Sequence, residues 1–171
     1  MAQVIGQRED GSVPAILVGD YITAMGGGRF TPMQILKLAY LGHGFTLGIT
    51  GQPLFRDRIE AWKYGPVIPA LYDAIRAHGG APVPRLYSCG TPVTSPDIGK
   101  RMDELGGRFT ANNLAIVRKT VETYGEYEEF LLSYITHMDG SPWKRAFDRG
   151  GLHARIEDDD LKSYYREQLK E

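Results

Sequence analysis

Residues 31–49, with the sequence TPMQILKLAYLGHGFTLGI, carry apolar side chains at positions that would surround a helix on nearly every side. Lys37 is the one charged residue among them. A soluble protein can hold such a helix only at its centre, because any exposed face would leave large apolar side chains in water. The segment therefore predicts a compact domain in which the other elements pack around residues 31–49.

Capping residues mark both ends of this central helix. Thr31 fits the N-cap, Pro32 fits the first helical position, and Gln34 completes a Thr-x-x-Gln capping box. Gly48 and Gly51 follow at the other end. Because glycine is costly inside a helix and favoured just beyond it, we expect the chain to turn there.

The length and charge of the chain limit its domain organisation and its partners. A chain of 171 residues is long enough for one domain with a full core and too short for two domains of typical size. Its formal net charge is -1, and both halves mix basic and acidic residues, so we expect no direct nucleic-acid binding. We predict a flexible N-terminus at residues 1–12 and a single domain at residues 13–171.

The sequence also favours a cytoplasmic protein that does not enter the membrane. Its single cysteine, Cys89, excludes an internal disulfide and fits a reducing cytosol. The first twelve residues lack the basic and apolar regions of a secretory signal. A membrane span at residues 31–50 would have to bury Gln34, Lys37 and His43 in lipid, which argues against it.

Amphipathic patterns predict six further helices, at residues 13–25, 66–78, 110–124, 126–138, 142–150 and 158–170. In the helix at 126–138 we expect Phe130, Leu131 and either Tyr134 or Ile135 to face the core. The acidic run at residues 158–160 falls in the first turn of the last helix, where the helix dipole favours negative charge. The predicted fold class is therefore mainly α, a single multi-helix domain.

Two stretches could add a small β-hairpin or strand pair. Residues 53–65 alternate between two sets of side chains, which suits an extended or hairpin-like excursion. Residues 81–108 contain four prolines with several glycines and serines, and we expect a long surface excursion there. At most, a short strand pair could form near residues 85–89 and 107–110.

The residues that commonly carry catalysis or bind metal form no clear pattern. Cys89 could in principle act as a nucleophile with one of the histidines, which are His43, His78, His137 and His153. The histidines have no metal-ligand spacing, and the glycines at 26–28 lack the Lys-Ser/Thr ending of a phosphate loop. We therefore predict no catalytic residue, no cofactor and no metal.

The most distinctive local pattern is the stretch EAWKYGPVIP at residues 60–69. Its aromatic side chains can bury a large apolar area, and their polar N–H and O–H groups then need hydrogen-bond partners. Its Gly-Pro step fixes a turn into the following helix. One interpretation is a structural corner of the core. The other is a partner-binding corner, whose residues would be Trp62, Lys63, Tyr64, Pro66 and Pro69.

At this point the chain resembles the Panacea-domain family, which includes SocA-like antitoxins and GepA-like phage-associated proteins. The similarity lies in the segments at 33–40, 51–55 and 59–69, followed by Leu-Ser at 132–133, Thr-His at 136–137 and Ser-Pro-Trp at 141–143. The segments keep the family's order and span most of the chain. The structural residues of this motif are Leu36, Lys37, Tyr40, Gly65, Pro142 and Trp143.

The resemblance implies a helical domain that binds and neutralises a protein toxin, and one branch of the family delivers its toxin to a ClpXP-type protease. It implies no catalytic residues. The chain departs from the family pattern at residues 39–44 and in the long excursion at 81–109, which leaves the identity of the partner open. The alternatives are a phage- or prophage-encoded protein that acts on a host or defence protein, a structural or phage-assembly protein, and an unrecognised enzyme.

Overall fold

The computed structural model describes residues 8–86 and 98–171. Within these residues the chain forms eight α-helices, one short 3-10 helix and one hairpin of two strands. In chain order the elements are α1 (Ala15–Met25), α2 (Pro32–Thr50), β1 (Glu60–Trp62), β2 (Gly65–Val67), α3 (Pro69–Ile75), η1 (Arg76–His78), α4 (Ile98–Gly106), α5 (Ala111–Tyr124), α6 (Glu129–Thr136), α7 (Pro142–Gly150) and α8 (Asp158–Gln168). The predicted mainly α fold class is confirmed.

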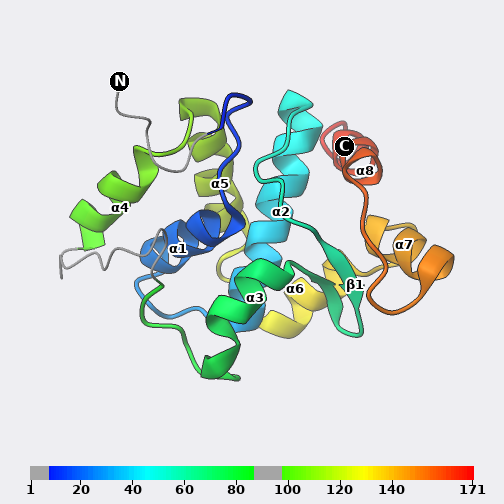
Figure 1. Cartoon of the computed structure of the whole chain (residues 1–171), viewed down its shortest axis with the longest axis horizontal. Helices are drawn as coiled ribbons and strands as arrows, with labels where there is room; N and C mark the ends of the chain where they lie inside the picture. The colour runs from blue at the N-terminus through cyan, green and yellow to red at the C-terminus, as the bar shows by residue number, and fades with distance from the viewer. Residues whose placement is uncertain (1–7, 87–97) are drawn as a thin grey trace.

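Helix α2 runs through the middle of the molecule, as its apolar sequence predicts (Figure 1). It packs against α1, α3, α5, α6, α8 and the hairpin, and 14 of its 19 residues are buried. The capping box is present, because the Thr31 hydroxyl accepts from the Gln34 amide and the Gln34 side chain accepts from the Thr31 amide. Gly51 ends the helix in the left-handed conformation, with φ 75°.

The closest packing of α2 is against α8, and two glycines make it possible. A Cβ atom at Gly44 would lie 2.4 Å from the ring of Tyr165, and one at Gly48 would lie 3.0 Å from the backbone of α8. The ring of Tyr165 also meets the rings of Tyr40 and Phe45 edge to face. Gly48 is therefore a contact residue inside α2, whereas we expected it to mark the end of the helix.

The two strands form a hairpin that overlaps the stretch at 53–65, which we expected to be extended or hairpin-like. The second strand reaches Val67, so the predicted helix at 66–78 begins only at Pro69. The strands pair antiparallel, with Glu60 opposite Val67 and Trp62 opposite Gly65. The other edge of β1 is covered by residues 153–156, because the Ala61 amide donates to the Ala154 carbonyl and the His153 amide donates to the Ala61 carbonyl. The hairpin is thus held on both sides, between α2 and the segment that leads into α8.

The prediction for residues 81–108 was wrong in part. Residues 98–106 form α4, which packs on α1 and buries Arg101 and Leu105. Residues 107–109 are not a strand, because their amides bond back to the last carbonyls of α4 and close its end. Residues 87–89 of the suggested strand pair, which include Cys89, lie outside the described residues.

The structure describes only part of the predicted flexible N-terminus. Residues 1–7 of the predicted flexible N-terminus lie outside the described residues, whereas Gly11 and Ser12 are buried and the Asp10 carboxylate pairs with Arg56. Hydrogen bonds from Ser12, with Arg56 adding to them, lower the Asp10 pKa to about 2.

None of the helices in the described residues combines the length and apolarity needed to cross a membrane.

The glycine contacts yield a stability prediction with an internal control. We expect Gly48→Ala to destabilise the fold by about 1–3 kcal/mol, because the added methyl group collides with the α8 backbone. Gly42→Ala should be neutral or stabilise by up to about 1 kcal/mol, because its Cβ would meet neighbours only at ordinary contact distance and alanine favours the helix. Chemical denaturation of both variants measures this, and equal effects would contradict the close packing of α2 on α8.

Candidate functional site

A buried lysine of α2, Lys37, holds the hairpin to the central helix. The Lys37 ammonium donates to the Pro66 carbonyl at 2.8 Å, and it is nearly inaccessible to water. Gly65, with φ 112°, leaves room for it, because a Cβ at this position would lie 3.0 Å from the Lys37 Nζ atom. Burial lowers the Lys37 pKa to about 7. The hydrogen bond therefore fixes β2 to the central helix.

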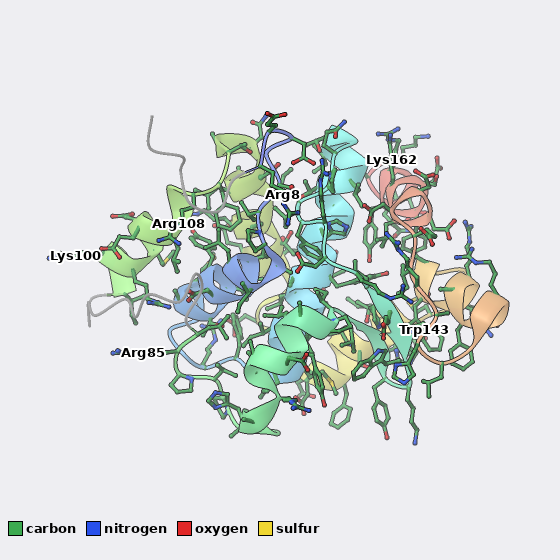
Figure 2. The ribbon with its side chains drawn as sticks, in the orientation of Figure 1. Arg8, Arg85, Lys100, Arg108, Trp143 and Lys162 are labelled. Atoms are coloured by element: carbon green, nitrogen blue, oxygen red, sulfur yellow. The ribbon has the colours of Figure 1, made fainter. Side chains whose placement is uncertain are left out.

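Trp62 is half-buried and connects the hairpin to three neighbouring elements. Its indole N–H donates to Glu60 at 2.8 Å, and its ring meets those of Tyr72 and His153 edge to face. Its carbonyl accepts from the Trp143 indole at 2.8 Å. Figure 2 shows Trp143 beside the hairpin. These contacts make Trp62 chiefly a structural residue of the corner.

The carboxylate of Glu60 lies at the centre of the polar contacts around Trp62. Burial alone would raise its pKa, but hydrogen bonds from Trp62, His153 and Arg58 outweigh that effect and lower the pKa below its ordinary value. Glu60 is therefore held in its charged form. The ionised carboxylate fixes the orientation of the Trp62 ring on the strand.

The five predicted partner-binding residues separate into an inner and an outer group. Pro66 is buried, while Trp62 and Pro69 are half-buried; Pro69 begins α3. Lys63 and Tyr64 form the two-residue turn and are exposed, with the Lys63 ammonium 5.2 Å from the centre of the Tyr64 ring. Only Lys63 and Tyr64 therefore present most of their side chains to a partner.

Helix α6 lies beside this turn, and its orientation differs from the one we predicted. Its inner face is formed by Leu132, Ser133 and Thr136, all buried. The Ser133 hydroxyl donates to the Tyr64 carbonyl, and the Thr136 hydroxyl donates within the helix at 2.8 Å. These small hydroxyl residues satisfy buried backbone carbonyls, which larger apolar side chains could not do.

The large apolar residues of α6 consequently face outward. Phe130 is 75% exposed, Tyr134 is 60% exposed and Leu131 is 46% exposed. The prediction that Phe130 and Leu131 face the core was wrong, as was the choice of Tyr134, while Ile135 is half-buried. The signal that could have corrected it is the shared helix face of Leu132, Ser133 and Thr136.

We call the exposed residues of the turn and helix the hairpin–α6 surface; its members are Lys63, Tyr64, Phe130, Leu131 and Tyr134. Monomeric proteins rarely expose several large apolar side chains in one place unless a partner covers them. Aromatic residues are also the types most enriched at the centres of protein interfaces. The arrangement is suited to protein binding.

The histidines belong to separate contacts of the fold. His43 is buried at the middle of the fold, where it stacks on Phe55 and bonds Asp158 at 2.9 Å, so it joins α2 to α8. In residues 8–86 and 98–171 there is no cluster of three or more histidine, cysteine or acidic residues that could hold a metal ion. Cys89, the proposed alternative nucleophile, lies outside those residues.

The buried lysine predicts a specific dependence of stability on pH. Between pH 7 and 10.5 the unfolded chain keeps a proton on Lys37 that the folded chain has lost, so the free energy of unfolding rises with pH in this window. In Lys37→Met this rise should be smaller by on the order of 2 kcal/mol between about pH 7 and 9. Loss of the bond to Pro66 lowers stability equally at every pH. Identical pH slopes in urea denaturation of both proteins would refute the lowered pKa.

Comparisons with known proteins place the chain in a family. The family described as Antitoxin SocA-like, Panacea domain, matches residues 35–144, which include most of α2, the hairpin and α6. The protein named antitoxin SocA, from Caulobacter vibrioides (strain NA1000 / CB15N), is 26% identical over 148 residues, covering 78% of this chain and 71% of that protein. No solved structure matches the chain significantly. The family match covers more than half of the sequence, so the chain belongs to the SocA-like antitoxins with a Panacea domain.

Proposed function

We propose that the protein is an antitoxin that binds a partner protein toxin through the hairpin–α6 surface and neutralises it by direct contact. Membership of the SocA-like family supports an antitoxin role and implies a protein toxin as partner. The observation that carries the more specific proposal is the exposure of Phe130 and Tyr134 on α6 and of Tyr64 on the turn that Ser133 of α6 bonds.

The structure of this surface is suited to tight binding. The turn is fixed by the Lys37–Pro66 bond beneath it and by the Ser133 hydroxyl beside it. Binding through such a surface costs little conformational entropy, because the backbone is already ordered. The exposed aromatic rings can then enter pockets of the partner and become the centre of the interface.

Contact can protect the cell in two ways that use the same surface. The antitoxin can cover the active part of the toxin, or it can present the toxin to a ClpXP-type protease. Both mechanisms require a stable complex. They differ in the fate of the toxin, which persists in the first case and disappears in the second.

The binding surface predicts the effect of one charge substitution. Phe130→Glu should weaken binding to the partner toxin by about 2 kcal/mol or more, because a carboxylate would have to be desolvated at the interface. That loss corresponds to a rise in Kd of roughly thirtyfold. Because Phe130 is 75% exposed, the variant should keep the wild-type melting temperature.

The matched control is Ile49→Glu, which places the same charge on an exposed apolar residue at the far end of α2. It should bind the toxin as the wild type does. The proposal would be wrong if Ile49→Glu weakened binding and Phe130→Glu did not. Calorimetric titration of each purified variant with the toxin measures both values.

The proposal also predicts stoichiometric protection. When the protein and the partner toxin are co-expressed at varied ratios, growth should recover as the ratio approaches equality and then remain constant. Immunoblotting of the toxin in the same cells distinguishes blocking, with toxin present, from delivery to a protease, with toxin lost. Full protection at a small fraction of the toxin's amount, with the toxin still present, would indicate turnover and contradict neutralisation by contact.

A further inference from the structure

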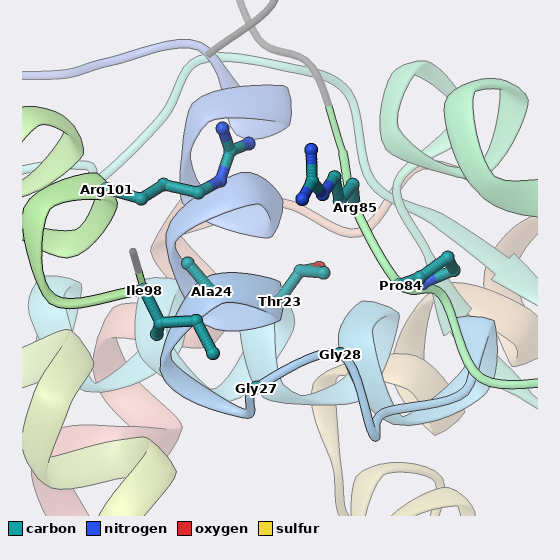
Figure 3. A pocket seen from close by; sticks show the side chains of 8 residues that line it. All are labelled: Thr23, Ala24, Gly27, Gly28, Pro84, Arg85, Ile98 and Arg101. Atoms are coloured by element: carbon teal, nitrogen blue, oxygen red, sulfur yellow. The ribbon is translucent and has the colours of Figure 1, made fainter. Parts of the chain in front are cut away.

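A second feature lies on the opposite side of the molecule from Trp143, next to Arg85 (Figure 2). It is a cavity of about 190 Å³ between the C-terminal end of α1, the segment at 84–85 and the start of α4. The residues that line it are Thr23, Ala24, Gly27, Gly28, Pro84, Arg85, Ile98 and Arg101. Figure 3 shows the Arg85 and Arg101 side chains extending to the same side of α1.

Arg101 is the most unusual residue of this cavity. It is buried, and its Nη2 atom donates both to the Asp20 carboxylate and to the Leu86 carbonyl. These two bonds fix the plane of the guanidinium. Its Nη1 atom is also buried and has no hydrogen-bond partner among residues 8–86 and 98–171. A buried charged donor without an acceptor costs free energy, so the position calls for an acceptor that the described part of the chain does not supply.

The charge balance of the cavity indicates what that group is. Two guanidinium groups line it, and no carboxylate is among its lining residues in the described part of the chain. The Asp20 carboxylate, which does not line the cavity, pairs with the charge of Arg101. The positive charge of Arg85 has no opposite charge among the lining residues that the structure describes. A guanidinium pairs best with a planar or tetrahedral oxyanion, because its parallel N–H groups can donate to two oxygens.

The remaining polar groups around the cavity are already used. The Thr23 hydroxyl donates to the Gly19 carbonyl at 2.8 Å. The amides of Gly26, Gly27 and Gly28 donate to carbonyls of the last turn of α1, which partly satisfies the negative end of that helix. The two arginines are therefore the groups that would hold an anion, and the helix end does little to repel it.

The size of the cavity limits the ligand. Pockets for drug-sized ligands usually have about 300–1,000 Å³, and this cavity is smaller than that range. We propose that Arg85 and Arg101 form a binding site for one small oxyanion, a carboxylate or a phosphate group, that accepts from the free Nη1 of Arg101. Arg101 forms the fixed, buried part of the site and the exposed Arg85 closes it from the solvent side.

The site is tested by calorimetric titration of the full chain with sodium phosphate and, separately, with sodium acetate, at constant ionic strength set with sodium chloride. We expect at least one of the two anions to bind with one site per chain. Arg85→Gln should weaken that binding by about tenfold or more, because a charge-assisted pair of hydrogen bonds is lost. Binding of phosphate alone or acetate alone would support the site and identify which oxyanion it prefers.

Two further variants make the result specific. Arg101→Lys keeps the positive charge that pairs with Asp20 but removes the Nη1 donor, so it should also weaken binding about tenfold. Arg76→Gln removes an exposed arginine of η1 that does not line the cavity, and it should change nothing. The proposal is overturned if neither anion binds the wild type, or if Arg85→Gln binds the anion as tightly as Arg76→Gln does.

Discussion

The burial of α2 on all sides is the constraint on which the rest of the structure depends. Every neighbouring element supplies a surface for it, and the tightest of these contacts is made by α8, whose Tyr165 ring and backbone lie directly over Gly44 and Gly48. The one charged residue of α2, Lys37, has to find an acceptor inside the protein, and it finds the Pro66 carbonyl. The central helix therefore also determines where the hairpin lies.

This arrangement explains why the candidate binding surface combines rigid backbone with exposed apolar side chains. Ser133 bonds the Tyr64 carbonyl and Thr136 bonds a carbonyl within α6, so the inner face of that helix is occupied by small hydroxyl residues around Leu132. Phe130, Leu131 and Tyr134 then have to face outward. A helix with this pattern stabilises the hairpin through polar contacts and leaves its apolar area exposed.

The sequence predicted the features that depend on local pattern. The capping box of α2, the hairpin and the mainly α fold all follow from residues near one another in the chain. The misplaced features depend on contacts between distant residues. Gly48 resembles a helix terminator unless Tyr165 is known to lie above it, and α6 has apolar residues on so many sides that periodicity alone could not select its inner face. Helix α4 was missed because Gly99 and the prolines before it obscure its short amphipathic pattern, whose buried members include Arg101.

Hydrogen–deuterium exchange of the protein with and without its toxin tests the central claim most directly, because it maps the contact without assuming which residues matter. The account predicts that peptides covering residues 62–66 and 129–138 become protected when the complex forms. It also predicts unchanged exchange in the apolar groove lined by residues of α2 and α5, which include Phe45, Ile116 and Tyr124. Protection of that groove, with exchange in residues 129–138 unchanged, would show that the hairpin–α6 surface is not where the partner binds.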